Sequence, residues 1–191
     1  MSVTTTLYLV RHAESAPDFA IAEAAWPLSA RGLVQAQTLA ANAPSFGATR
    51  LVSSPYRRAV ATLEPTSRAL ELPIRTEFDL RERHLRDGYA ENWDALLEQL
   101  WRDLDARMPN CESGRECRYR VQRCLDELAQ ACAGETLVAC SHGNAIALFL
   151  GGIDPSVGYE TWKRMRMVDV FRLRHDATGW EWDRDYVRPW T

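Results

Sequence analysis

Two short apolar runs in this chain each lead into a histidine, and this arrangement constrains the fold more than any other feature of the sequence. Residues 7–10 are followed by Arg11 and His12, and residues 137–140 are followed, after one serine, by His142. Short apolar runs bounded by polar residues are typical of buried strands. Open α/β sheets bind ligands beyond the carboxyl ends of their strands. Two of the four histidines therefore lie where such a sheet would hold a catalytic centre.

Strand and helix patterns alternate along the chain, which predicts an α/β fold. Besides the two runs above, we expect strands at residues 50–53, 74–80, 168–174 and 180–186, and helices at residues 28–40, 56–70, 93–108, 114–132 and 144–150. Pro65 is expected to kink or break its helix, and Gly151 with Gly152 to end the last one. The sequence thus predicts a three-layer α/β/α fold with a mostly parallel central sheet and an antiparallel edge strand.

Length and composition narrow the function classes. The 191 residues, 46% of them hydrophobic, suffice for one packed core, so we expect a single domain over residues 1–191. The net charge of −3 is spread along the chain without a long basic tract, which argues against a nucleic-acid partner and against a membrane anchor. Residues 1–6 lack the basic region of a signal peptide, so the cytoplasm is the expected compartment.

The five cysteines form no paired motif of the kind that holds zinc, so no metal is expected. Cys117, Cys124 and Cys132 recur at near-helical spacing together with Val121 and Leu125. This pattern predicts small apolar core residues rather than redox thiols.

Five motifs in order resemble those of the histidine phosphatase superfamily, branch 1, also described as phosphoglycerate mutase-like. They are RHAES at 11–15, LSARGLVQA at 28–36, SSPYRRAVAT at 53–62, LRERH at 80–84 and SHGN at 141–144. Ala13 stands where the family's opening motif more often has glycine. One such motif alone would be a weak signal, but five in sequence order are strong.

The resemblance implies a phosphoryl-transfer site without a metal or other cofactor. His12 is the expected nucleophile, which attacks phosphorus as a neutral imidazole and forms a phosphohistidine. Arg11, Arg58 and His142 are expected to hold the phosphoryl oxygens, on which negative charge accumulates in the transition state. Arg58 is favoured over its neighbour Arg57 as the arginine of the pocket.

Two proton transfers are needed, one to the departing alkoxide and one from the water that hydrolyses the intermediate. A single carboxyl group can serve both steps. Glu82 is the expected acid and base because it follows an expected strand and matches the family pattern. Glu14 is a rival by its proximity to His12, and Asp79 is a weaker one.

Other polar residues are candidates for substrate contacts or for plain solvent exposure. Ser15, Arg83 and Asn144 are expected to bind substrate, although Arg83 is nearly as well explained as a solvated charge. The arginines at 115, 118 and 120 could reach a second anionic group of the substrate, but a solvated helical face explains them better. His84 and His175 are interpreted as surface residues or as supports behind the site.

Two positions depart from the mutase pattern. Asp18 stands where many mutases have a phosphate-binding asparagine, and Leu85 stands where they tend to have a tyrosine. The chain is also shorter than typical mutases, which favours hydrolysis. Residues 83–110 exceed the connection expected in the shortest relatives, so a small helical cap is expected there and suggests small phosphorylated substrates. A homo-oligomer is compatible with exposed apolar residues of such a cap.

The leading hypothesis is a metal-independent phosphomonoester hydrolase that acts through a phosphohistidine on His12. The first alternative is phosphoryl transfer of the cofactor-dependent phosphoglycerate mutase type. The second is a catalytically inactive protein that binds phosphate or serves as a scaffold.

Overall fold

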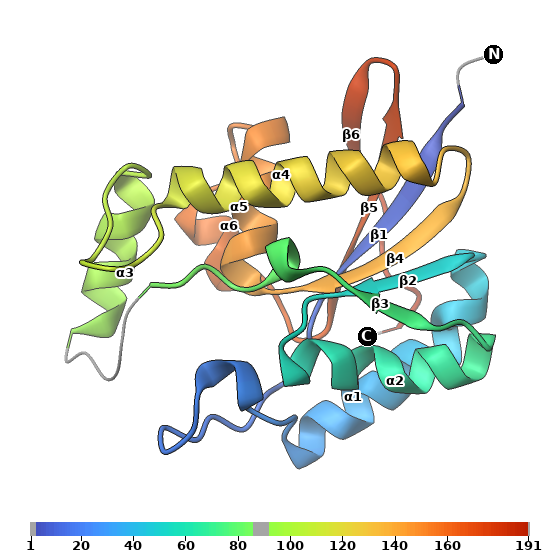
Figure 1. Ribbon diagram of the computed structural model, residues 1–191, viewed down its shortest axis with the longest axis horizontal. Helices are drawn as coiled ribbons and strands as arrows, with labels where there is room; N and C mark the ends of the chain where they lie inside the picture. The colour runs from blue at the N-terminus through green and yellow to red at the C-terminus, as the bar shows by residue number, and fades with distance from the viewer. Residues whose placement is uncertain (1–2, 86–91, 191) are drawn as a thin grey trace.

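The computed structural model describes residues 3–85 and 92–190 (Figure 1). One mixed sheet runs through the described part of the chain, with the strand order β3-β2-β4-β1-β5-β6. Its strands are β1 (Thr5–Arg11), β2 (Arg50–Ser53), β3 (Ile74–Thr76), β4 (Thr136–Ser141), β5 (Asp169–Asp176) and β6 (Gly179–Asp183). The helices are α1 (Ala30–Asn42), α2 (Arg57–Leu70), α3 (Trp93–Arg102), α4 (Gly114–Ala131), α5 (Gly143–Ile153) and α6 (Tyr159–Arg164).

Four neighbouring strands, β3, β2, β4 and β1, run parallel to one another. β5 pairs antiparallel with β1 on one side and with β6 on the other. The fold class predicted from the sequence is therefore confirmed, including the antiparallel edge. The four parallel strands end on the same side of the molecule. Whatever follows them in the sequence is brought together there.

Alternating side chains of the central strands build two cores, one on each face of the sheet. Leu7 and Leu9 of β1 pack with residues of α4 and α5, whereas Tyr8 and Val10 pack with residues of α1 and α2. Figure 1 shows the same layers, with α1 and α2 below the sheet and α4 and α5 above it. Both faces of the central strands are covered, which explains why they are apolar throughout.

Several predicted element boundaries were wrong. β3 ends at Thr76 because its partner β2 is short, and residues Phe78–Leu80 form a 3-10 turn instead. α3 ends at Arg102, well before residue 108. α5 continues through Gly151 and Gly152. It does so because α4 packs against it, and such packing overrides weak helix propensity.

α2 passes through Pro65 without interruption, so the predicted break is also wrong. Pro65 is one of the buried residues of α2, so it lies on the face of the helix that is turned to the protein interior. α6 was not foreseen, because its six residues are too few to show a helical period.

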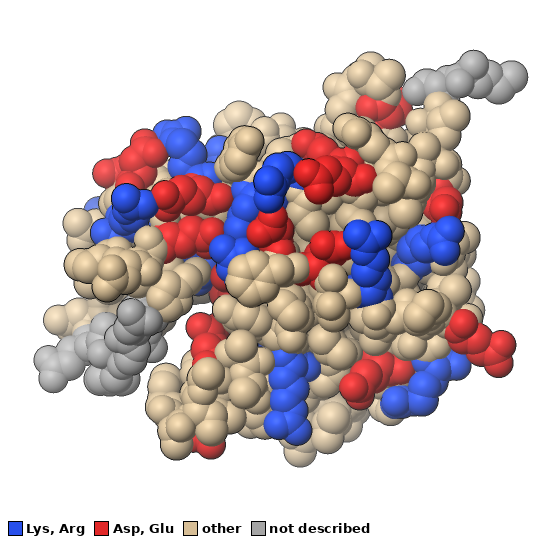
Figure 2. Space-filling view, viewed as in Figure 1, with Lys and Arg blue, Asp and Glu red and all other residues tan. Residues whose placement is uncertain are grey.

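Three further features bear on the predictions from composition. Cys117 and Cys124 are buried, as expected of core residues, and Cys132 is half-buried. Within residues 3–85 and 92–190, no helix is long and apolar enough to cross a membrane. On the face shown in Figure 2, acidic and basic side chains are interspersed rather than gathered into one basic surface.

Candidate active site

The two histidines at strand ends lie side by side, although 130 positions separate them in the sequence. β1 and β4 are parallel neighbours in register, with Arg11 opposite Ser141, and the backbone N–H of His12 donates to the Ser141 carbonyl at 3.0 Å. The centroids of the His12 and His142 rings are 5.0 Å apart. The sheet register therefore assembles the pair that the sequence predicted at two separate strand ends.

His12 is held in one tautomer. Its Nδ1 lies 2.7 Å from the carbonyl oxygen of Ala13, and a carbonyl can only accept, so Nδ1 carries the proton. The lone pair is then on Nε2, which accepts from Arg58 Nε at 3.2 Å. Burial, followed by the nearby charge of Arg58, lowers the pKa of His12 to about 3. His12 is thus a neutral imidazole at physiological pH, and the lone pair of its Nε2 points toward the guanidinium of Arg58.

Arg58 is the arginine that reaches the site, and Arg57 is exposed. β2 lies next to β4, so the start of α2, where Arg58 lies, falls beside His142 and His12. Arg58 is buried beneath aromatic rings, with its guanidinium 5.0 Å from the ring centre of Tyr56 and 5.7 Å from that of Trp26.

A carboxylate that the sequence analysis did not foresee lies against this arginine. Glu23 accepts from Arg58 Nη2 with its Oε1 at 2.6 Å and from Nη1 with its backbone carbonyl at 2.8 Å. Glu23 belongs to a single 3-10 turn in the loop between β1 and α1. No sequence pattern marks this position, because only the course of the loop brings it to Arg58.

His142 lies directly before α5 and is completely buried, with Nε2 at 2.7 Å from Ser54 Oγ. Burial, and then the charge of Arg58, lowers the pKa of His142 well below its usual value. Ser54 belongs to the third motif, but the sequence analysis assigned it no role. Its hydroxyl orients the second histidine.

Among the buried nitrogens without a hydrogen-bond partner in the described part of the chain, two belong to predicted site residues. They are Nδ1 of His142 and Nε of Arg11. Arg11 is otherwise tied by Nη1, which donates to the Met165 carbonyl at 2.7 Å. Burial lowers the pKa of Arg11, and the opposing charge of Glu82 partly offsets this effect. A buried polar group without a partner is costly, so these nitrogens indicate a ligand that brings acceptors.

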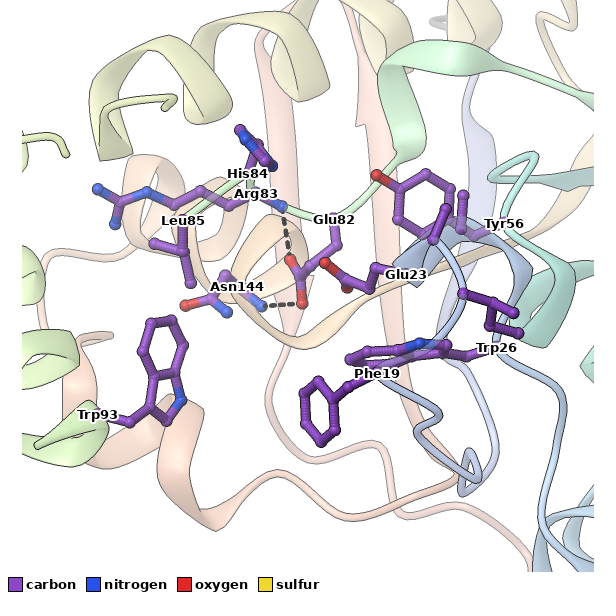
Figure 3. A pocket seen from close by; sticks show the side chains of 13 residues that line it. Phe19, Glu23, Trp26, Tyr56, Glu82, Arg83, His84, Leu85, Trp93 and Asn144 are labelled. Carbon is purple, nitrogen blue, oxygen red and sulfur yellow. Dashed lines mark hydrogen bonds between the residues drawn. The ribbon is translucent and has the colours of Figure 1, made fainter. Parts of the chain in front are cut away.

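Glu82 lies at the amino end of α5. One carboxylate oxygen accepts from the backbone N–H of Arg83 at 2.8 Å and of Ala145 at 3.1 Å, and the other accepts from that of Asn144 at 3.2 Å (Figure 3). Backbone donors at a helix start favour a negatively charged group. The carboxylate is thereby fixed at the edge of the cavity.

The two rival carboxylates are engaged elsewhere. Glu14 accepts from the Ser29 hydroxyl at 2.7 Å and lies 3.6 Å from the guanidinium of Arg31, at the start of α1. Asp79 pairs with Arg81 at 3.2 Å and with Arg123 at 2.6 Å. Neither of them lines the cavity described below, whereas Glu82 does.

Arg120, interpreted from the sequence as part of a solvated face, is in fact buried. Its Nη1 donates to the carbonyls of Asp79 and Arg81 at 2.6 and 2.9 Å, and its Nη2 donates to that of Glu82 at 3.1 Å. Glu112 accepts from it at 2.5 and 2.7 Å. Burial opposes the charge, but the bonds to Glu112 outweigh it and raise the pKa of Arg120. Arg120 therefore positions the segment that carries Glu82.

Replacing Arg120 with Met should lower the free energy of unfolding by about 3 kcal/mol, because the partly buried Glu112 loses its nearer counter-charge and keeps only Arg81 at 3.6 Å. We also expect kcat to fall, since three carbonyls around Glu82 lose their donor. Urea unfolding and steady-state kinetics measure the two effects. Arg123→Met on the same helix is the matched control, because Arg123 is exposed, and it should leave stability nearly unchanged. Equal stability of both variants would contradict the positioning role.

A cavity of about 570 Å³ lies beside these residues (Figure 3). Glu23, Tyr56 and Glu82 line it, whereas the two histidines at strand ends, Arg11 and Arg58 are not among the lining residues. Asn144 lines it, and its Oδ1 accepts from Trp101 Nε1 at 3.1 Å. Ser15 is not among the lining residues and instead pairs with Leu28 in an isolated bridge. Its proposed substrate contact stays a prediction.

Arg83 is among the residues that line the cavity. Its guanidinium, however, points away from the side chain of Glu82 (Figure 3). The guanidinium donates to the carbonyls of Glu112 at 3.1 Å, Ala106 at 3.3 Å and Leu100 at 3.5 Å. The alternative of a solvated charge is therefore wrong, because Arg83 is buried, whereas its predicted substrate contact stays a prediction. In this structure Arg83 ties residues 100–112 to the Glu82 segment.

The two departures from the mutase pattern have separate consequences. Asp18 accepts from the backbone N–H of Ala20 at 2.9 Å and thus closes a turn within its own loop. Leu85 is buried and lines the cavity with an apolar side chain. His84, interpreted as a surface or supporting residue, also lines the cavity.

The residues described by the structure include no group of three or more His, Cys, Asp or Glu that could hold a metal ion. The positive charge near the two histidines comes from Arg11 and Arg58.

Comparisons with known proteins agree with this arrangement. The family model of the histidine phosphatase superfamily (branch 1) matches residues 7–186. The probable phosphoglycerate mutase GpmB of Escherichia coli is 30% identical over 191 residues, which cover 91% of this chain and 86% of that protein.

Solved structures show the same fold at lower identity. A mycobacterial glucosyl-3-phosphoglycerate phosphatase superposes with a TM-score of 0.76 at 21% identity, covering 94% of this chain and 97% of its own. A mutant phosphoserine phosphatase of Entamoeba histolytica, solved in complex with phosphoserine, gives a TM-score of 0.79 at 15% identity and covers 97% of both chains.

Proposed function

Because this chain belongs to branch 1 of the histidine phosphatase superfamily, we propose that it is a phosphomonoester hydrolase that acts through a phosphohistidine on His12. The family predicted from the five motifs is confirmed, and relatives bear the names of both phosphatases and mutases. The choice of hydrolysis and the roles of the residues are the proposal.

The tautomer of His12 is the observation that carries the proposal. A nucleophile for phosphorus needs an unprotonated nitrogen at neutral pH, and Nε2 is one because Nδ1–H is bound to the Ala13 carbonyl. The low pKa of His12, about 3, keeps this nitrogen unprotonated. A histidine that served only to bind phosphate would gain from being protonated.

In the first step, Nε2 forms a bond to phosphorus while the ester P–O bond breaks. The guanidinium groups of Arg11 and Arg58 stabilise the charge that spreads over the remaining oxygens. Nδ1 of His142 and Nε of Arg11, which lack partners among the described residues, would donate to those oxygens. Glu82, as the general acid of this step, gives a proton to the departing oxygen.

In the second step, water attacks the phosphohistidine and the N–P bond breaks. Glu82, now a carboxylate, takes a proton from that water, and the electron pair of the broken bond returns to Nε2. Inorganic phosphate leaves and the starting state of both residues is restored. No metal is needed in this scheme, because Arg11 and Arg58 supply the positive charge and His142 supplies a further hydrogen-bond donor.

Residues 83–110 act in this proposal as a small cap over the cavity. Within their described part, α3 contributes Trp93 to the cavity wall and buries Leu97, Leu100 and Trp101 in the core. A wall of this kind favours small phosphorylated molecules over phosphoproteins. The expected homo-oligomer and cytoplasmic location stay predictions.

The mutase alternative is favoured by the 30% identity to a probable phosphoglycerate mutase. The reaction products distinguish it from hydrolysis. With a chelator present throughout, we expect release of inorganic phosphate from p-nitrophenyl phosphate at an unchanged rate. Any 3-phosphoglycerate consumed should appear as glycerate and phosphate, measured by ³¹P nuclear magnetic resonance. Formation of 2-phosphoglycerate would instead establish the mutase. Phosphate binding without turnover of any ester would favour the scaffold alternative.

A further inference from the structure

The walls of the cavity beside the reacting residues are aromatic and apolar. Phe19, Trp26 and Leu85 line it together with Trp93, and they come from three separate segments of the chain (Figure 3). Trp26 is fixed, because its Nε1 donates to the Asp18 carbonyl at 2.8 Å and its ring packs on Phe19 with centroids 5.5 Å apart. The leaving group of a substrate would lie between these rings.

The same walls offer little positive charge to a leaving group. Among the described lining residues, Arg83 is the only arginine or lysine, and its guanidinium is bound to three backbone carbonyls. His84 is the only other lining residue that can become cationic. Two carboxylates, Glu23 and Glu82, line the cavity as well. A second anionic group on the substrate would therefore meet negative charge without a described counter-charge.

Glu23 has the larger part in this effect. Its carboxylate accepts from Arg58 Nη2 at 2.6 Å. It thereby neutralises positive charge of Arg58 that would otherwise attract a second anionic group. Its side chain keeps about 39% of its surface exposed, so it also faces the entering molecule. Glu82, by contrast, is held by three backbone donors and serves the reaction itself.

We propose that this site selects phosphomonoesters with an apolar, uncharged leaving group, and that Glu23 is the residue that discriminates against a second anionic group. The proposal rests on the hydrolase function proposed above. It follows from two properties of one cavity. Aromatic side chains favour transfer of an apolar group out of water. The wall carries two carboxylates, and the guanidinium of its one arginine is bound to backbone carbonyls, so a second anion is disfavoured. Sugar-acid phosphates would be poor substrates, and aryl phosphates good ones.

The test compares two esters that differ by one charge, phenyl phosphate and 4-carboxyphenyl phosphate. We expect kcat/KM to be about tenfold higher for phenyl phosphate, which is the effect of one modest like-charge interaction. In Glu23→Gln this preference should fall to about threefold or less, because the amide is neutral. Glu64→Gln is the matched control, because Glu64 is exposed on α2, and it should keep the wild-type preference.

A second variant tests the apolar wall. Phe19→Ala should lower the ratio of kcat/KM for phenyl phosphate over methyl phosphate about fivefold, because methyl phosphate has almost no apolar surface to bury. Phe19 is 66% exposed, so the variant should fold. Tyr119→Ala, at a 70% exposed aromatic residue on α4, should leave the ratio unchanged.

Equal turnover of both aryl esters by the wild type, or an unchanged preference in Glu23→Gln, would overturn this assignment. Either result would leave the hydrolase function standing, because hydrolysis itself is still observed. A failure of the hydrolase proposal would give a different result: the esters would still be turned over after His12 is replaced.

Discussion

His12→Ala is expected to lower kcat/KM for p-nitrophenyl phosphate by more than about 10⁴-fold, because no other group in the described site offers an unprotonated nitrogen in the same place. His142 does not substitute, since its Nε2 is bound to the hydroxyl of Ser54 at 2.7 Å. Brief reaction of the wild type with ³²P-labelled substrate should trap an acid-labile phosphoenzyme. The variant should trap none.

Two controls separate loss of the nucleophile from loss of the fold. His175→Ala removes a histidine at the far end of β5, and it should keep wild-type activity and the labelled intermediate. Circular dichroism should show the same secondary structure for His12→Ala and the wild type. A His12→Ala protein that folds and still turns over the ester at the wild-type rate would refute the proposed mechanism.

Glu82→Gln is expected to lower kcat for phenyl phosphate by about 10²- to 10³-fold, because the phenolate must then leave without a proton. The first step should suffer far less with 2,4-dinitrophenyl phosphate, whose leaving group needs no proton. The second step should remain slow with this ester, because Glu82→Gln lacks the base that takes a proton from the attacking water. Stopped-flow absorbance should therefore show a burst of dinitrophenolate, equal to the enzyme concentration, followed by slow turnover.

The rival carboxylate provides the control for this prediction. Glu14→Gln should keep wild-type kinetics with both esters, because Glu14 is bound to Ser29 and faces α1. Thermal unfolding of Glu82→Gln should be measured beside the kinetics, since an amide replaces one acceptor at the start of α5. A burst in Glu14→Gln and none in Glu82→Gln would transfer the acid and base role to Glu14.

The contrast between Glu82 and Glu23 has a wider meaning for the site. Both are carboxylates near cationic residues, but backbone donors hold the first and a guanidinium holds the second. A phosphoryl group that enters must share Arg58 with Glu23. The site thus differs from a simple anion-binding pocket, and affinity for free phosphate should be modest.

Local pattern was enough to predict much of this protein. Apolar runs ending at His12 and His142 predicted two strands with candidate residues at their carboxyl ends; the structure confirms both strands and shows that they are neighbours. The first long helix was expected to begin near residue 28, and α1 does begin close to it, at Ala30, with the Ser29 hydroxyl accepting from the Gly32 N–H as a cap. Such features depend on a few neighbouring residues, whose periodicity and capping chemistry are visible in the sequence.

The supporting residues escaped prediction because their partners are distant. Arg120 follows the buried face of α4 only one turn after Cys117, which hinted at burial, but charge argued for solvent. Its partners are backbone carbonyls about 40 residues away, and a carbonyl is the same at every position of a sequence. Arg83 was misjudged for the same reason.

By itself, the sequence determined the family, the α/β class and the order of the strands along the chain, and it nominated the side chains proposed to react. These follow from short motifs and from periods of two and of about 3.6 residues. Tertiary structure alone decided the tautomer of His12, the contact between Glu23 and Arg58, and the burial of Arg120. Each depends on atoms that the chain brings together only after the strands have paired and the loops have closed, so no local pattern encodes it.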